Sequence, residues 1–277
     1  MGGLILLVSM KEILVKAQNE HYGVVAPNIL NEDTARAAIE AATELHAPII
    51  IDIGYLMHPN INMLVHITSE YAKAAPVPVA VNLDHGASFE HAIAALRAGF
   101  TSIMVDRSSL PFKENVREVA DIVRIAHAVH VDVESELGHV GDAQQYEKDR
   151  DAGLTDPEEA AAYVQQTGVD FLAVAVGTAH GPYRGVPHLD FERLSAIRKA
   201  VSIPLVLHGG SGSGDENLCH AIECGISKIN IATDLFTAGR ENIQNDTPTY
   251  QIYYEVTAGY KEKLKYYIKL FGMENKA

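Results

Sequence analysis

The sequence has no tryptophan, only two cysteines and no long hydrophobic run. Cys219 and Cys224 lie in one helical stretch at a spacing that suits neither a zinc knuckle nor a disulfide framework, so both are expected to be reduced thiols. No apolar run approaches the ~18 residues that a membrane-spanning helix needs. These absences argue against a disulfide-rich secreted scaffold and against a membrane protein. We therefore expect a soluble, cytoplasmic protein.

Positive charge is also scarce. The formal net charge is −14, and the sequence contains no cluster of Lys and Arg. The negative protein should repel the phosphates of nucleic acid, which disfavours nucleic acid as a partner. An anionic ligand would need a local site. The opening GGLILLVS lacks a basic region and a cleavage site, and Ser9 with Glu12 has the pattern of a capping box, so no signal peptide is expected.

Eight apolar, β-rich runs recur along the 277 residues, with amphipathic helical patterns between them. Alternating strands and helices imply parallel strands with right-handed crossovers, and eight such units most economically close into a (β/α)8 barrel. We predict this α/β fold, a TIM barrel, as a single domain over residues 1–277; a doubly wound open sheet is the alternative. The predicted strands are 22–27, 48–53, 77–83, 101–105, 131–137, 171–176, 204–208 and 227–232, and the predicted helices include 31–45 (Asn31 as N-cap), 88–99, 112–129, 156–168 and 190–201.

Three segments depart from the repeating unit. Residues 138–155 and 177–189 are long irregular connections, which in a compact barrel are usually functional loops. Residues 249–272 are predicted to form an additional C-terminal helix with an aromatic stripe. Such a stripe should pack on the barrel or on another subunit, and we expect a homo-oligomer, either a dimer or a tetramer.

Polar residues stand at or just past the carboxyl ends of seven predicted strands. In a barrel those ends share one face, and barrel active sites lie there. Residues far apart in the sequence should therefore converge. They are Asn28, Asp84, His85, Asp106, Glu136, His180, His208 and Asn230.

Three of these residues are histidines, each followed by glycine in DHG, AHG and LHGG. Three converging imidazoles favour an open metal site of the kind that catalytic zinc prefers, and glycine lets the backbone approach a ligand closely. Asp106 and Glu136 would either orient the imidazoles or bind a displaced or second metal. Most of the other ten histidines are expected to be structural, while the role of His139 stays open.

Two glycine- or polar-rich loops predict an anion site. GGSG at 209–212 precedes a helix and can form a nest of backbone N–H groups, and NIAT at 230–233 leads into a helix near Asp234. The loops after strands seven and eight hold phosphate in many barrels. Arg184 can add a charge-assisted contact. The sequence therefore predicts a phosphate site beside the histidines.

The motifs NLDHG, MVDRSSLPFKENV, ESELGHVG, TGVDFLAVAVGTAHGPYRG, PLVLHGGSG and KINIATD resemble the class II, metal-dependent ketose-phosphate aldolases, the group of fructose- and tagatose-bisphosphate aldolases. The resemblance covers nearly all of residues 9–235, in order and in spacing. It implies a carbon–carbon lyase that reversibly splits a phosphorylated ketose, a small-molecule sugar, into dihydroxyacetone phosphate and an aldehyde. A metal on the ketone would spread the developing charge as an enediolate.

The resemblance also assigns residues. It implies Zn²⁺ on His85, His180 and His208, with Asp106 and Glu136 at an alternative position where a second divalent or monovalent cation could bind. It implies Asp84 as the acid and base that moves the proton. Arg184 stands where the family usually has lysine. The substrate- and phosphate-binding residues that we predict are Asn28, Gly181, Arg184, Gly209, Gly210, Ser211, Asn230, Ile231, Ala232 and Thr233.

The sequence departs from the family pattern at three places. Gln144 aligns with a glutamate that moves a proton at the nucleophilic carbon, and Asp142, Glu147 or Asp149 could substitute for it. Ser109 replaces a common histidine. The stretch 246–260 contains no Lys or Arg, although bisphosphate aldolases hold their distal phosphate with a basic residue near this point. We therefore expect a ketose 1-phosphate as substrate rather than a 1,6-bisphosphate.

Three alternatives stay open at this stage. One is a fructose- or tagatose-1,6-bisphosphate aldolase proper. A second is a non-catalytic, metal-binding regulatory subunit of such an aldolase, which the altered loop 142–149 suggests. A third is Schiff-base chemistry on Lys228, which shares strand parity with Asn230 but lies deeper in the strand.

Overall fold

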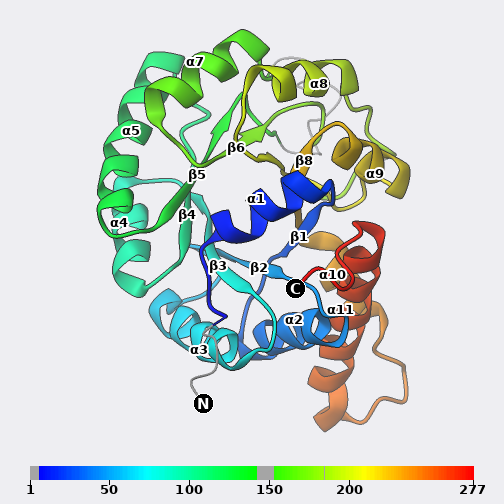
Figure 1. The fold of residues 1–277 in the computed structure, drawn as a ribbon. Coiled ribbons are helices and arrows are strands. Elements are labelled where there is room, and N and C mark those ends of the chain that lie inside the picture. Colours follow the sequence, from blue (N-terminus) through cyan, green and yellow to red (C-terminus); the bar gives the residue numbers. More distant parts are fainter. Residues whose placement is uncertain (1–5, 142–152, 184) are drawn as a thin grey trace.

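Parallel strands form the centre of the molecule, and helices surround them (Figure 1). The computed structural model describes residues 6–141, 153–183 and 185–277. Neighbouring strands follow the order β1-β8-β7-β6-β5-β4-β3-β2. The strands are β1 (Val24–Pro27), β2 (Ile49–Gly54), β3 (Val79–Gly86), β4 (Ser102–Val105), β5 (Asp132–Leu137), β6 (Phe171–Val174), β7 (Leu205–Leu207) and β8 (Ile226–Ile231).

The seam between β1 and β2 decides between a barrel and an open sheet. The first strand pairs in parallel with the last, Val24 opposite Lys228. On its other side β1 meets β2 through a single bridge between Asn28 and Asp52, and the Ile29 N–H donates to the Asp52 carbonyl at 3.0 Å. The sheet therefore curls into a nearly closed (β/α)8 barrel. The prediction of a TIM barrel is confirmed, and the doubly wound alternative was wrong.

The helices occupy the positions that the apolar periodicity predicts. Strands such as β2 are buried on both faces, which is why they appear as continuous apolar runs rather than alternating ones. Ser9 with Glu12 and Asn31 with Thr34 form the expected caps at two helix starts. The helices are α1 (Met10–Glu20), α2 (Glu32–Glu44), α3 (Ile61–Ala74), α4 (Phe89–Ala98), α5 (Phe112–Ala128), α7 (Pro157–Thr167), α8 (Phe191–Ala200), α9 (Asp215–Glu223), α10 (Thr233–Glu241), the 3-10 turn η1 (Thr249–Gln251) and α11 (Ile252–Leu270).

The third strand is longer at its carboxyl end than the sequence pattern indicated. The apolar run ends at Leu83, but β3 continues to Gly86, which pairs with Val105 after a shift of register. A Cβ atom on Gly86 would lie 2.6 Å from the Met104 carbonyl oxygen, so only glycine permits this approach. The extension matters because Asp84 and His85 belong to the end of the strand itself and not to a loose connection.

Two helices outside the repeating unit close and flank the barrel (Figure 1). Helix α1 crosses the amino ends of the strands, where the Lys11 N–H donates to Asp132 at 2.8 Å. Helix α11 packs along α10 and α2, and Lys261 pairs with Glu40 and Glu44 of α2. The tail is therefore an additional helix that packs on the barrel, as the aromatic stripe predicted.

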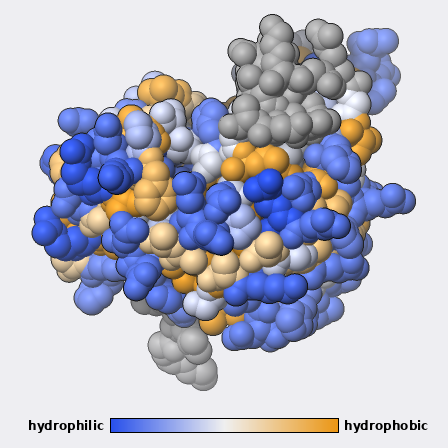
Figure 2. Space-filling model, turned by 90° about the horizontal axis from the view of Figure 1, so that it is seen from above, coloured by the Kyte–Doolittle hydropathy of each residue, from blue (hydrophilic) through white to orange (hydrophobic). Residues whose placement is uncertain are grey.

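The face of the molecule drawn in Figure 2 is mostly hydrophilic. Figure 2 shows a face on which polar and charged side chains surround small, separate apolar patches. No helix in the described part of the chain combines the length and the apolar character that a membrane crossing requires.

Candidate metal centre and active site

The carboxyl ends of the strands open into a cavity of about 430 Å³, a volume within the range of small-molecule sites. Most of the site residues predicted from the sequence line this cavity, although they come from several different strand ends. They are Asn28, Asp84, His85, Asp106, His180, Gly181, His208, Gly209, Gly210, Ser211, Asn230, Ala232 and Thr233. The lining also includes Met57, His139 and Val140, of which only His139 had drawn attention in the sequence.

Some predicted residues lie elsewhere. Glu136 is buried within β5, and Ile231 is buried at the end of β8 with its side chain in the core, so neither lines the cavity. Ser109 is exposed and lies outside the lining. Five residues with predicted roles lie outside the described part of the chain, so those roles stay predictions. They are Asp142, Gln144, Glu147, Asp149 and Arg184.

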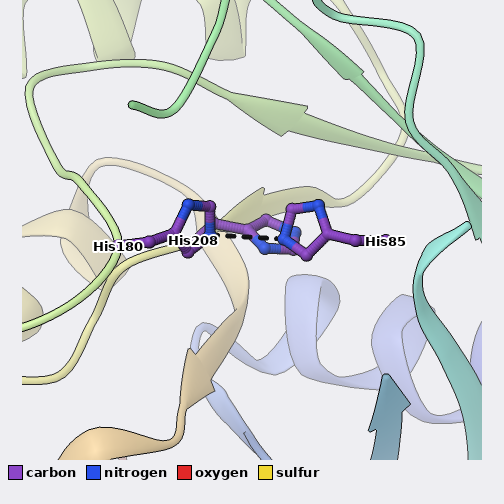
Figure 3. A group of neighbouring side chains, drawn as sticks. All are labelled: His85, His180 and His208. Carbon is purple, nitrogen blue, oxygen red and sulfur yellow. Dashed lines mark hydrogen bonds between the residues drawn. The ribbon is translucent and has the colours of Figure 1, made fainter. Parts of the chain in front are cut away.

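Three imidazoles converge at the centre of this face (Figure 3). His85 Nε2 lies 3.2 Å from His180 Nε2, and the ring centroids of His85 and His208 are 4.7 Å apart. One ring nitrogen from each histidine lies within 4.8 Å of the other two. His85 holds its ring there with a left-handed backbone, φ 49°, an uncommon conformation for a residue other than glycine. The donor set is three nitrogens around one point, which suits a facial metal site with open positions.

The charges around the trio favour a cation. Burial lowers the pKa of His180 to about 4 and also lowers that of His208, so both rings stay neutral, the form that binds metals. Burial alone would also lower the pKa of His85, but the Asp84 charge and the hydrogen bond to Asp106 outweigh it and raise the pKa to about 10. Carboxylates thus make positive charge favourable where the three nitrogens meet. The residues present fit a divalent cation.

Asp84 stands beside the histidines as an ionised carboxylate. Its Oδ2 accepts a hydrogen bond from Asn28 Nδ2 at 2.7 Å, and its Oδ1 accepts one from Asn230 Nδ2 at 3.1 Å. Burial would raise its pKa, but the charges of His85, His208 and Lys228 bring it down to about 2. The carboxylate therefore lines the cavity as a proton acceptor, fixed by amides from the ends of β1 and β8.

Two more carboxylates lie on the other side of His85. Asp106 Oδ2 is 2.9 Å from His85 Nδ1, so Asp106 orients this ring. Burial and the nearby Asp106 charge raise the pKa of Glu136 to about 8. Glu136 Oε1 accepts from the Val140 N–H at 2.9 Å, while Oε2 has no hydrogen-bond partner among the described residues. His85, Asp106 and Glu136 together could hold a cation at a second position.

His139 contacts the same carboxylate cluster through a serine. Its Nδ1 lies 2.9 Å from Ser108 Oγ, and Ser108 Oγ donates to Asp106 Oδ1 at 2.7 Å. The ring stands at the mouth of the cavity, on the segment that leads into the loop after β5.

The loops after β7 and β8 meet at the opposite wall. Gly209 has φ +68°, and a Cβ atom there would lie 2.3 Å from the Ala179 carbonyl oxygen. Ser211 Oγ accepts the N–H groups of Ala232 and Asp234 at 3.1 and 3.3 Å, so it caps α10 from outside the helix. Because the hydroxyl accepts from both amides, its own hydrogen remains available to an anion in the cavity. This part of the lining could hold an anion, so the phosphate site stays a prediction.

Sequence reasoning missed one buried carboxylate that touches the site. Glu134 lies in the barrel interior, with Oε1 2.9 Å from His208 Nε2 and Oε2 2.8 Å from Lys228 Nζ. Burial would raise the pKa of Glu134, but the charge of Lys228 and the bond to His208 lower it. The available signal was strand parity, since Glu134 and Glu136 are two residues apart in β5 and face the same way.

Lys228 is fully buried and does not line the cavity. Its ammonium lies between Glu134 and Asp52, at 2.8 and 3.4 Å. Burial would lower its pKa, but these two carboxylates outweigh burial and raise it. A protonated amine is not a nucleophile, so the surroundings of Lys228 do not suit Schiff-base chemistry.

Comparison with known proteins identifies the family of this chain. The chain matches the family "Fructose-bisphosphate aldolase class-II" over residues 8–276. It is similar to the YdjI aldolase from Escherichia coli K12, with 37% identity, a TM-score of 0.87 and coverage of 98% of this chain and 99% of the other. A provisionally named fructose-1,6-bisphosphate aldolase from Coccidioides immitis has 29% identity and a TM-score of 0.86, with 96% and 97% covered.

The fructose-bisphosphate aldolase from Campylobacter jejuni has the same fold at 23% identity, with a TM-score of 0.80 and coverage of 98% and 97%. The family match spans almost the whole chain, including every strand that supplies a residue to the cavity. This protein therefore belongs to the class II fructose-bisphosphate aldolase family and is an aldolase, a lyase that breaks and forms carbon–carbon bonds.

Proposed function

We propose that this protein is a zinc-dependent aldolase that reversibly cleaves a ketose 1-phosphate into dihydroxyacetone phosphate and an aldehyde. The observation that carries the proposal is the convergence, in one cavity, of three imidazole nitrogens, the ionised Asp84 and the glycine-rich wall of the β7 and β8 loops. His85, His180 and His208 would hold the metal. When bound, the metal would supply a Lewis acid that polarises the ketone carbonyl.

The protein's own residues would position the substrate and move the proton. Gly209, Ser211 and Thr233 would bind the phosphate through amide and hydroxyl hydrogens, which fixes the ketose in one orientation. Asp84 would take the proton of the hydroxyl next to the broken bond, and that carbon would leave as the aldehyde. The electron pair of the bond stays on the dihydroxyacetone phosphate carbon, which then takes up a proton.

The lining of the cavity supports a 1-phosphate. Among residues 6–141, 153–183 and 185–277, no lysine or arginine side chain lines the cavity. The described tail agrees, because α11 places Lys261 and Lys265 against acidic residues of α2. A bisphosphate aldolase proper is the second candidate, favoured by the family match itself.

The test is a coupled assay for dihydroxyacetone phosphate with ketose 1-phosphates and 1,6-bisphosphates offered side by side. We expect activity on a 1-phosphate that disappears on thorough chelation and returns with Zn²⁺. Activity that survives chelation would overturn the zinc mechanism, and a strong preference for bisphosphates would overturn the substrate assignment. Metal binding without release of triose phosphate from any ketose offered would support a regulatory subunit instead.

Assembly and location stay part of the proposal. Tyr250 of η1 and Tyr253 and Tyr254 at the start of α11 have 70–75% of their surface exposed, an apolar surface that a second copy could cover. Sedimentation equilibrium of the purified protein tests the proposed homo-oligomer, and fractionation of the producing cells tests the proposed cytoplasmic location. We expect no affinity for nucleic acid, given the net charge of −14.

A further inference from the structure

A buried chain of charged groups runs through the barrel and ends on His208. Glu134 of β5 lies between His208 and Lys228 of β8, with contacts of 2.9 and 2.8 Å. Lys228 in turn pairs with Asp52 of β2 at 3.4 Å, and Asp52 Oδ1 accepts from Asn82 Nδ2 at 2.8 Å. Glu134, Lys228 and Asp52 are all 0% exposed. These contacts join four strands, β5, β8, β2 and β3, across the interior of the barrel.

The hydrogen bonds fix which nitrogen of His208 carries its hydrogen. Glu134, paired with an ammonium, is ionised and can only accept, so His208 Nε2 must donate to it. At the other edge of the ring, Asn230 Nδ2 lies 3.3 Å from His208 Nδ1. The amide donates, so Nδ1 presents a lone pair. Two neighbours on opposite edges therefore select the same tautomer, and Nδ1 carries the ring lone pair, which a cation would take over from the Asn230 amide hydrogen.

The burial of these groups argues against a purely structural role. Glu134 and Asp52 share one ammonium in the dry interior, where burial raises the pKa of Asp52 to about 7 and where an ion pair often contributes less stability than apolar residues of the same volume would. The ionised Glu134 lies directly behind a ring of the predicted metal site, where it strengthens that ring as an electron donor.

We propose that Glu134, held by Lys228 and Asp52, is a positioning residue that sets the tautomer and orientation of His208 and thereby the affinity of the site for a divalent cation. The inference rests on the metal site of the proposed function and adds three residues that do not touch the substrate cavity. Glu134 acts through His208 and is not itself a catalytic residue.

Glu134→Gln is the informative substitution because it is nearly isosteric and should reverse the tautomer. The oxygen of the new amide would accept from Lys228, which leaves its NH2 group facing His208 Nε2. The ring must then accept at Nε2 and carry its hydrogen on Nδ1, the nitrogen that the metal needs. Glu134→Asp keeps a carboxylate acceptor on a side chain that is one carbon shorter. It should therefore preserve the His208 tautomer but weaken the hydrogen bond from His208 Nε2.

The chain contains a matched control far from the site. Asp170, just before β6, bonds His127 Nε2 at 2.8 Å and Lys11 Nζ at 2.9 Å, the same trio of histidine, carboxylate and lysine. It lies at the amino end of the barrel, beneath α1, on the face opposite the cavity. Asp170→Asn therefore makes the same chemical change without a path to the metal.

The experiment measures Zn²⁺ affinity by chelator competition for the full-length wild type, E134Q, E134D and D170N, together with the unfolding midpoint of each and the visible absorption of the Co²⁺-loaded proteins. We expect E134Q to bind Zn²⁺ about 10–100-fold more weakly than the wild type, with a changed Co²⁺ spectrum, since loss of such a partner usually has this effect. E134D should lie between them, and D170N should match the wild type in Zn²⁺ affinity and in the Co²⁺ spectrum.

Wild-type affinity and an unchanged Co²⁺ spectrum in E134Q would overturn the positioning role while leaving the proposed function intact. A lower unfolding midpoint with unchanged affinity would overturn it as well, because Glu134 would then be structural. If the wild type itself binds no Zn²⁺, the proposed function and this inference both fall. Either glutamate variant decides the question if the other does not fold.

Discussion

Asp84 is held by three strands at once, and this explains its position. Asn28 from the end of β1 and Asn230 from β8 donate to its two oxygens, while Asp84 itself lies near the end of β3. We expect Asp84→Asn to lower the cleavage rate by about 10²–10⁴-fold, because the amide cannot accept the proton. The coupled assay measures the rate at saturating Zn²⁺, because loss of the Asp84 charge should also weaken cation binding. A wild-type rate in the zinc-saturated variant would contradict a role in proton transfer.

A second carboxylate governs stability rather than catalysis. Burial would raise the pKa of Asp170, but the Val133 N–H, His127 and Lys11 bond to it and lower the pKa below its ordinary value. The stabilisation is therefore complete above the unfolded-state pKa, about 3.9, and is lost as the pH falls through the lower folded-state value. Urea unfolding between pH 7 and pH 3 should show D170N losing less stability on acidification than the wild type. Parallel curves would contradict this assignment.

At the scale of elements, the loop after β7 needs glycine at position 209 for two reasons. The backbone there is left-handed, and it lies close to the loop that contains Ala179. An alanine at Gly209 would adopt φ +68° and push its Cβ to 2.3 Å from the Ala179 carbonyl oxygen. Gly99, which ends α4 at φ +93°, offers a comparison, because a Cβ atom added there would meet no other atom within 4 Å. A substitution at Gly99 therefore isolates the backbone effect.

We expect G99A to lose about 1–2 kcal/mol of unfolding free energy, the usual cost of the left-handed conformation. G209A should lose more than G99A and should also bind phosphate ligands more weakly, since the loop must move. Urea unfolding gives the first comparison, and titration with dihydroxyacetone phosphate gives the second. Equal losses in the two variants would show that the contact with Ala179 relaxes freely.

At the scale of the whole molecule, the C-terminal helix reaches the active-site end of the barrel. Tyr260 is fully buried in α11, and its hydroxyl donates to the Asn28 carbonyl at 2.8 Å. Tyr260→Phe leaves that carbonyl without this donor and should cost about 1–3 kcal/mol of unfolding free energy. The exposed Tyr253, changed to Phe, should stay within about 0.5 kcal/mol of the wild type. Comparable losses in Y260F and Y253F would contradict the role of the Tyr260 contact.

Local patterns were sufficient for much of this architecture. The apolar runs located all eight strands to within three residues at each end, and Asn31 marked the start of α2, because caps and strand burial depend on neighbours in the chain. The error at β3 has a tertiary cause. Gly86 continues the strand only because β4 offers it a partner at Val105.

The sequence by itself determined the repeating unit, the residue types at the strand ends and the motifs that identify the family, since each of these is written in a short stretch of chain. Only the tertiary structure decided that Glu134 touches His208, that Lys228 is an ion-paired core residue and that His139 faces the cavity. The physical reason is that these contacts depend on closure of the barrel. Residues in β2, β5 and β8 become neighbours only when the sheet curls on itself, and burial then sets their charges.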